Sequence, residues 1–303
     1  MKHMKTALFI ALSITTVAFL FYWIAAVRKQ SAAEGVKWMP GPLDALIGFV
    51  TNFFDTLGIG SFATTTAIFK LRGLVRDEKI PGTLNVGHTP PSVLEAFIFI
   101  AIVTVDPTTL FSMIAASSLG AWFGAGVVAR WPRRAVQVGM GIALIGAAGL
   151  MLHSQLSPDP AGGTDVGVTG VKLGIAVAAN FMLGALMTLG IGLFAPCMIL
   201  VTMLGMNPKV AFPIMMGSCA FLMPTGSIRF IRERSYNLKS ALGLAIGGIP
   251  GVLIAAYIVK ELSLRTVKWL VIVVVVYTAS MMLRSAMVER TRRPVEVMPS
   301  IGG

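Results

Sequence analysis

The stretch TLGIGSFA at residues 56–63 recurs about 130 residues later as TLGIGLFA at residues 188–195. The copies differ only where Ser61 is replaced by Leu193. Each copy lies inside a long apolar segment, and its Gly-Ile-Gly triplet can open the backbone of a membrane helix. Paired, glycine-interrupted apolar segments at corresponding places in two halves are typical of carriers whose binding site lies between the halves.

The composition indicates a membrane protein. Of 303 residues, 55% are hydrophobic and 13% are charged, whereas a soluble domain carries roughly 25% charged residues. The net charge of +12 would suggest nucleic acid as a partner of a soluble protein. Here Lys and Arg gather in short loops between apolar runs, as the positive-inside rule expects. The expected partner is therefore the lipid bilayer, and nucleic-acid binding is not expected.

The apolar segments divide the chain into two matching series. The predicted divisions are an N-terminal transmembrane anchor and link (1–40), a first repeat (41–152), a linker (153–169), a second repeat (170–285) and a basic cytoplasmic tail (286–303). The offset between the two series stays near 130 residues, which indicates an internal duplication. We expect a multi-pass protein of the cytoplasmic (inner) membrane.

The first segment of each repeat is longer than one membrane crossing requires. Residues 42–71 and 170–204 exceed the ~20 residues of a spanning helix, so each is either one kinked helix or a re-entrant hairpin. Hairpins place the basic loop 229–239 and the tail on the same side as the basic loop 72–82, as the positive-inside rule requires. The predicted fold is an all-α polytopic membrane protein with two inverted repeats. Each repeat is a re-entrant helical hairpin plus three transmembrane helices, preceded by one extra N-terminal helix, which gives seven spanning helices and an external N-terminus.

The broken segments are the predicted binding site. Helices that restart after Gly60 and Gly192 would present free backbone N–H groups at the positive end of the helix dipole, which favours a small anion. Nearby Thr, Ser and Asn side chains could donate further hydrogen bonds. The candidate substrate-binding residues are Thr56, Gly58, Gly60, Ser61, Asn85, Thr89, Thr188, Gly190, Gly192 and Ser218. The alternative is that these residues only pack and hydrogen-bond neighbouring helices.

Ionisable residues at membrane depth are functional candidates by default. Asp55 directly precedes the repeated stretch, and His88 titrates near neutrality when unperturbed, so both are candidates for coupling transport to protons. Glu95 is interpreted as structural. Cys197 and Cys219 lack metal-ligand spacing, and the sequence contains no catalytic motif. We therefore expect neither an enzyme nor a cofactor nor a metal site.

The motifs resemble a known family. Gly-Ile-Gly occurs early in each half and is followed about 25 residues later by Gly-Thr-Leu-Asn (82–85) or Gly-Ser-Cys (217–219). Over residues 41–285 this pattern resembles the TauE/SafE sulfite-exporter permeases. The resemblance implies a duplicated carrier for sulfite or another sulfur oxyanion, or for an organosulfonate.

The chain also departs from that family's usual pattern, which continues Gly-x-Gly-Gly-Gly and then reaches a proline. Ser61-Phe62 and Leu193-Phe194 replace the additional glycines, and only the second half has the proline, Pro196. The residues leave open two other classes: a non-transporting membrane scaffold, and a metal or cation carrier that uses Met, Asp55 and His88. They also leave open the direction of transport, the coupling ion and assembly into a homo-oligomer.

Overall fold

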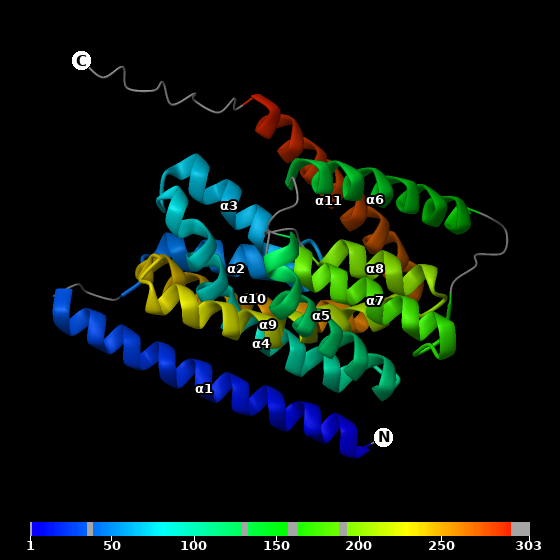
Figure 1. Cartoon of the computed structure of the whole chain (residues 1–303), viewed down its shortest axis with the longest axis horizontal. Coiled ribbons are helices and arrows are strands. Elements are labelled where there is room, and N and C mark those ends of the chain that lie inside the picture. Colours follow the sequence, from blue (N-terminus) through cyan, green and yellow to red (C-terminus); the bar gives the residue numbers. More distant parts are fainter. Residues whose placement is uncertain (1, 35–38, 129–132, 157–162, 188–192, 292–303) are drawn as a thin grey trace.

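The computed structural model describes residues 2–34, 39–128, 133–156, 163–187 and 193–291. In chain order its helices are α1 (Lys2–Glu34), α2 (Pro42–Thr56), α3 (Ser61–Arg72), η1 (Asp77–Lys79), α4 (Ile80–Ile102), α5 (Pro107–Val128), α6 (Arg133–Leu156), α7 (Gly170–Met187), α8 (Phe194–Met203), η2 (Pro208–Val210), α9 (Ala211–Arg232), α10 (Leu238–Glu261) and α11 (Leu264–Thr291). Outside these helices the described residues contain one isolated β-bridge, between Asp165 and Met206. The predicted all-α class is confirmed (Figure 1).

Five of the described helical stretches are long and apolar enough to cross a membrane. They are Lys5–Lys29, Gly170–Met187, Pro208–Arg232, Leu238–Glu261 and Arg265–Val288. The chain is therefore a multi-pass membrane protein, whereas the total of seven spanning helices stays a prediction. The helix α4 is not among the five, because it carries His88, Glu95 and the internal prolines Pro90 and Pro91.

The first copy of the repeated stretch breaks a helix, as predicted. Residues 57–60 separate α2 from α3, and Gly58 and Gly60 adopt φ angles of 94° and 88°. Glycine reaches these angles easily because it has no Cβ, and other residues pay a steric cost there. In the second copy α7 ends at Met187 and α8 begins at Phe194, and residues 188–192 lie outside the described part of the chain.

Both broken segments turn back on themselves. At the end of the second segment, Leu204 accepts a hydrogen bond of 3.1 Å from Nζ of Lys172, near the start of α7. In the first segment, Ile47 near the start of α2 shares a hydrophobic cluster with Phe69 near the end of α3. These contacts bring the start of each segment near its end, and the re-entrant hairpins stay a prediction.

The main helix contacts are between the two halves and not within them. The first helix of each half packs against a long helix of the other half's series: α2 against α10, and α7 against α5. The third helices, α4 and α9, pack against each other, and so do the last helices, α6 and α11. The halves are therefore interlocked rather than placed side by side as separate bundles.

Glycines make these contacts close. In the pairs α2–α10 and α7–α5, a Cβ added to either of two glycines would collide with the facing backbone. The contacts are Gly48 on Leu244 and Gly247 on Ala45 between α2 and α10, and Gly184 on Ser117 and Gly120 on Phe181 between α7 and α5. On each helix, the glycine and the residue contacted by the partner helix's glycine are three positions apart, for example Gly48 and Ala45 on α2. The same glycine-based packing is thus built twice, and small residues are what such membrane-helix interfaces use.

Apolar side chains also cover the outside of the molecule. Ile14, Val17 and Phe21 of α1 and Leu253 and Tyr257 of α10 are exposed. Helices that are apolar on the outside as well as in the core fit a lipid environment. The helix α1 lies along one edge of the bundle and packs against α4, α5 and α9 (Figure 1).

Candidate functional site

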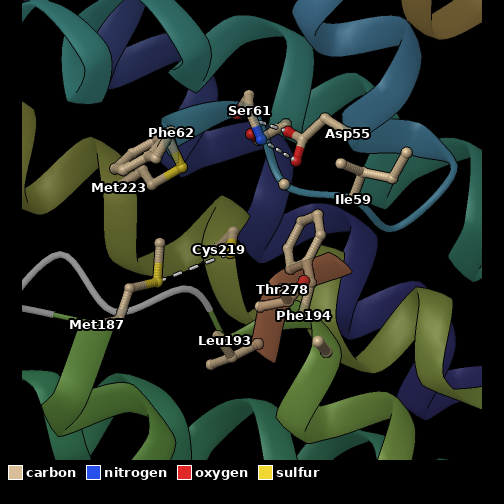
Figure 2. Close-up of a pocket in the computed structure, with 13 residues that line it drawn as sticks. Asp55, Ile59, Ser61, Phe62, Met187, Leu193, Phe194, Cys219, Met223 and Thr278 are labelled. Atoms are coloured by element: carbon tan, nitrogen blue, oxygen red, sulfur yellow. Dashed lines mark hydrogen bonds between the residues drawn. The ribbon is translucent and has the colours of Figure 1, made fainter. Parts of the chain in front are cut away.

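A cavity of about 60 Å³ lies at the break between α2 and α3. Because a water molecule needs about 10–15 Å³ by this measure, the cavity has room for roughly four water-sized groups. Its wall from the first half is partly polar, and its wall from the second half is mostly apolar and rich in sulfur, with Thr278 as a polar residue (Figure 2). The polar wall includes Asp55, Gly60, Ser61 and Ser92, and the opposite wall includes Met187, Leu193, Phe194, Cys219 and Met223.

Asp55 caps the helix that starts at this cavity. Its carboxylate accepts a hydrogen bond of 2.8 Å from the backbone N–H of Ser61 and another of 2.9 Å from the Ser61 hydroxyl. Figure 2 shows the two side chains turned toward each other at the cavity wall. The sequence predicted free N–H groups at this helix start, but the Ser61 N–H is occupied by an anion of the protein itself. An acidic group at a helix N-terminus is stabilised by the helix dipole and by the unpaired N–H groups.

Gly58 and Gly60 play different parts. Gly58 is buried, and an added Cβ would lie 3.1 Å from Sδ of Met198, so this glycine packs against the second half. Gly60 lines the cavity, and an added Cβ would have no atom within 4 Å. A side chain at residue 60 would therefore project into open space at the cavity wall.

Thr56 faces Glu95 instead of the cavity lining. Its Oγ1 lies 2.8 Å from the carbonyl oxygen of Asn52 and 2.6 Å from Oε1 of Glu95. Glu95 is completely buried, and its second oxygen, Oε2, has no hydrogen-bond partner among the described residues. Ser92, which lines the cavity, is one helical turn from Glu95 on α4. Glu95 thus lies directly behind the polar wall.

His88 belongs to a satisfied network between three helices. Its Nδ1 lies 3.0 Å from Oδ1 of Asn52 on α2, and its Nε2 lies 3.1 Å from Oγ1 of Thr65 on α3. Nδ2 of Asn52 donates to the carbonyl of Gly48, which leaves Oδ1 to accept from the ring. Nδ1 therefore carries the proton and Nε2 accepts from Thr65. A neutral His88 meets both of its partners, which is the arrangement of a structural residue.

The other described candidates lie at helix interfaces. Thr89 on α4 is 3.1 Å from the Ser227 hydroxyl on α9. The Ser218 hydroxyl accepts a bond of 3.4 Å from the amide of Asn180, between α9 and α7. Nδ2 of Asn85 donates to the carbonyl of Pro81 on its own helix. The contacts of Thr89 and Ser218 fit the alternative interpretation of helix-to-helix bonding, whereas the bond of Asn85 stays within α4.

Three predicted binding residues, Thr188, Gly190 and Gly192, lie outside the described residues. The described neighbours on either side of them, Met187 and Leu193, both line the cavity.

Sequence reasoning missed the sulfur-rich wall. Sγ of Cys219 lies 3.8 Å from Sδ of Met187, and both side chains line the cavity (Figure 2). Part of this wall could have been predicted from the repeat. Met187 and Leu193 occupy the positions in the second half that Asp55 and Ser61 occupy in the first. Thr278 was also missed: it lines the cavity and its hydroxyl has no partner among the described residues. Its signal was a polar side chain within the apolar run 270–279.

Metal binding finds no support in the described residues. No three His, Cys, Asp or Glu side chains among them come close enough to hold an ion together. The two cysteines are free thiols.

The comparison with known families agrees with the predicted resemblance. Residues 172–303 match the family model described as Sulfite exporter TauE/SafE. No curated protein and no solved structure matches the chain. The matched region contains α8, α9, α11 and all but the first two residues of α7, the helices of the second half that line the cavity.

Proposed function

We propose that this chain, whose residues 172–303 match the TauE/SafE sulfite exporters, is a permease that carries a small anion across the cytoplasmic membrane. The expected cargo is sulfite, another sulfur oxyanion or an organosulfonate. One observation carries the proposal: a cavity inside the bundle is built jointly by the broken helix of the first half and by helices of the second half. A site between two duplicated halves, at broken helices, is the arrangement of secondary carriers.

The helix starts around the cavity support an anion. The helix α3 begins with Gly60 and Ser61 at the cavity, and α8 begins there with Leu193, Phe194 and Ala195. Their dipoles direct partial positive charge toward the cavity. At α3 the Asp55 carboxylate already accepts from the Ser61 N–H, whereas no side chain caps α8, so the α8 start is the one that supports an anion. Thr278 adds a buried hydroxyl that is free to donate. Thr188, Gly190 and Gly192 remain proposed binding residues because they connect the two limbs of the second hairpin.

The size and lining of the cavity support a compact head group. Room for roughly four water-sized groups suits one sulfur atom with its oxygens. The opposite wall offers Phe194, Met187 and Met223, which are apolar and polarisable, and Phe62 of the first half adds a further aromatic ring. Such a wall suits the sulfur atom itself or the short carbon chain of a sulfonate. Polar donors on one side and soft apolar groups on the other provide both orientation and shape.

We further propose that the halves are inverted repeats. The exchange of partners between α2–α10 and α7–α5 is what two halves related by a pseudo-two-fold axis would produce. The distribution of charge supports the orientation. One end of the bundle gathers the basic residues Arg72, Arg76, Arg229, Arg232, Arg234 and Lys239. The other end also has basic residues, Lys172, Lys209, Lys260 and Arg265, but they lie among the acidic residues Asp106, Asp165 and Glu261. By the positive-inside rule the first end is cytoplasmic.

Thermal unfolding of the purified protein tests the proposal. Sulfite, sulfate, thiosulfate and taurine are added separately, with chloride at equal ionic strength as the control. A ligand present at 100 times its Kd stabilises the folded state by about 2.7 kcal/mol, so at least one sulfur anion should raise the unfolding temperature above the chloride value. The same anion should then cross the membrane of reconstituted vesicles. Stabilisation by none of the four contradicts the proposed function and leaves the scaffold alternative.

A further inference from the structure

Asp55 at the cavity wall and Glu95 behind that wall are two buried carboxylates with no cation bound to either among the described residues. Asp55 is 3% exposed and Glu95 is fully buried. Oε1 of Glu95 lies 2.6 Å from Oγ1 of Thr56, the residue next to Asp55, so the two acids are neighbours. Neither acid forms an ion pair within the described residues. Two adjacent negative charges in a low-dielectric interior are very costly, so such a pair shares a proton.

The hydrogen bonds indicate where the proton of the empty protein lies. Asp55 accepts two bonds from Ser61, which stabilises its charged form. The Thr56 hydroxyl has a single hydrogen but faces two oxygens, the Asn52 carbonyl and Oε1 of Glu95. If Thr56 donates to Asn52, the short contact to Glu95 needs a proton from the Glu95 carboxyl. A protonated Glu95 and an ionised Asp55 therefore fit all of these contacts.

An anion in the cavity changes this balance. Asp55 lines the cavity, so its carboxylate would face the anion at close range. It would also compete with the anion for the N–H and O–H groups of Ser61. Both conflicts disappear if Asp55 takes up a proton, because the Ser61 donors can then turn to the anion and the new carboxyl O–H becomes a further donor.

Among the described residues, no charged side chain other than Asp55 lines the cavity. The helices that pack against α4 carry further titratable groups. Near the acids lie Cys219 on α9 and His88 on α4 itself. The others are Asp44 on α2, Lys5, Tyr22, Arg28 and Lys29 on α1, Lys70 and Arg72 on α3, Glu78 and Lys79 in η1, Arg229 and Arg232 on α9, and Lys239, Tyr257, Lys260 and Glu261 on α10. Lys5 donates to the carbonyl of Ile100, beyond Glu95 on α4. His88 is held by Asn52 and Thr65 and does not line the cavity.

We propose that Asp55 and Glu95 form the proton-coupling site of the permease, which takes up one proton when an anion enters the cavity and releases it when the anion leaves. This inference rests on the proposed anion transport. It assigns a role to Glu95, which the sequence indicated to be structural, and it removes His88 from the coupling. Proton and anion then cross together, so that a pH gradient can drive the anion.

Calorimetry of anion binding tests this proposal. Sulfate and thiosulfate are the probes, because neither titrates from about pH 5 to pH 8, whereas sulfite does. Comparing buffers of different ionisation enthalpy gives the protons taken up, and we expect about one per anion. By linkage, the affinity should rise about tenfold for each unit that the pH falls, in the range where the empty pair holds one proton.

Two variants and two controls complete the test. The double variant Asp55→Asn/Glu95→Gln should bind the anion with no proton uptake and with an affinity that does not depend on pH. The matched controls Asp44→Asn, on the same helix as Asp55, and Glu261→Gln, at an exposed helix end, should keep the wild-type uptake. Wild-type binding without proton uptake, or uptake retained by the double variant, overturns the proton site alone. Absence of binding to every probe overturns the proposed function as well. If the double variant does not fold, the pH dependence of wild-type affinity still decides.

Discussion

Replacing Gly60 tests the cavity most directly, because the chain provides a matched control. Gly60 and Gly73 are the caps at the two ends of α3, and both have positive φ angles, 88° and 61°. An added Cβ meets no atom within 4 Å at either residue. The two positions differ in that Gly60 lines the cavity, whereas Gly73 is exposed at the far end of the helix. We therefore compare Gly60→Leu with Gly73→Leu.

The expected costs follow from the backbone and from the volume. Gly73 lies in the left-handed helical region, where another residue costs about 1–2 kcal/mol. Gly60, with ψ of 125°, lies outside that region, where the cost is about 1–3 kcal/mol. Both variants should therefore unfold below the wild type, and Gly60→Leu should be the less stable of the two. The leucine at residue 60 places about four carbon atoms where the cavity has room for roughly four water-sized groups. Anion-dependent stabilisation and transport should therefore be lost in Gly60→Leu and kept in Gly73→Leu.

The assays are thermal unfolding with and without the stabilising anion, and uptake by vesicles that contain equal amounts of each variant. Gly60→Ala adds one carbon and should weaken transport without abolishing it. Wild-type transport by Gly60→Leu, at normal amounts in the membrane, would refute the assignment of the cavity as the binding site. Equal loss in Gly73→Leu would show that strain in α3 is the cause and not the filled cavity.

Two further variants separate structural from cavity-lining residues. His88→Leu leaves Asn52 and Thr65 without their shared partner, so thermal unfolding should show a loss of about 1–3 kcal/mol for each unpaired group. The pH dependence of sulfate binding should not change, and a flattened profile would contradict the structural role of His88. Cys219 lines the cavity and Cys197 does not. Sulfate at ten times its Kd should therefore slow the reaction of N-ethylmaleimide with Cys219 about tenfold. The reaction with Cys197 should keep its rate. Equal protection of each cysteine, measured in the two single-cysteine proteins, would argue for a general closing of the protein.

The break in the first repeated segment could be predicted from the sequence because its signals are local. The Gly-Ile-Gly triplet, the excess length of the segment and the loop charges all depend on nearby residues. The positive φ angles of Gly58 and Gly60 are the conformations that such a triplet permits. The interlocking of the halves could not be predicted, because it depends on which glycine faces which backbone across helices far apart in the sequence.

The candidate site was predicted only in part for the same reason. Gly60, Ser61 and Asp55 come together at the cavity because a few residues of one turn connect them. Thr89 and Ser218 lie on helices whose polar residues can face any of several neighbours, and their partners are other helices. Periodicity places a residue on a helix face, but it does not say what that face contacts.

The duplication itself supports the view that Asp55 and Ser61 act as one unit. In the second copy Met187 replaces Asp55 and Leu193 replaces Ser61, so the acid and its hydroxyl donor are lost together. A serine kept only to begin a helix would have no reason to disappear with the acid. Conversely, an acid at residue 187 would face the cavity without a side-chain donor. The first half thus contributes the acid and the Ser61 donors, and the second half contributes shape and the single hydroxyl of Thr278. We expect proton exchange at one wall of the cavity only, where one proton taken up offsets one negative charge of the bound anion.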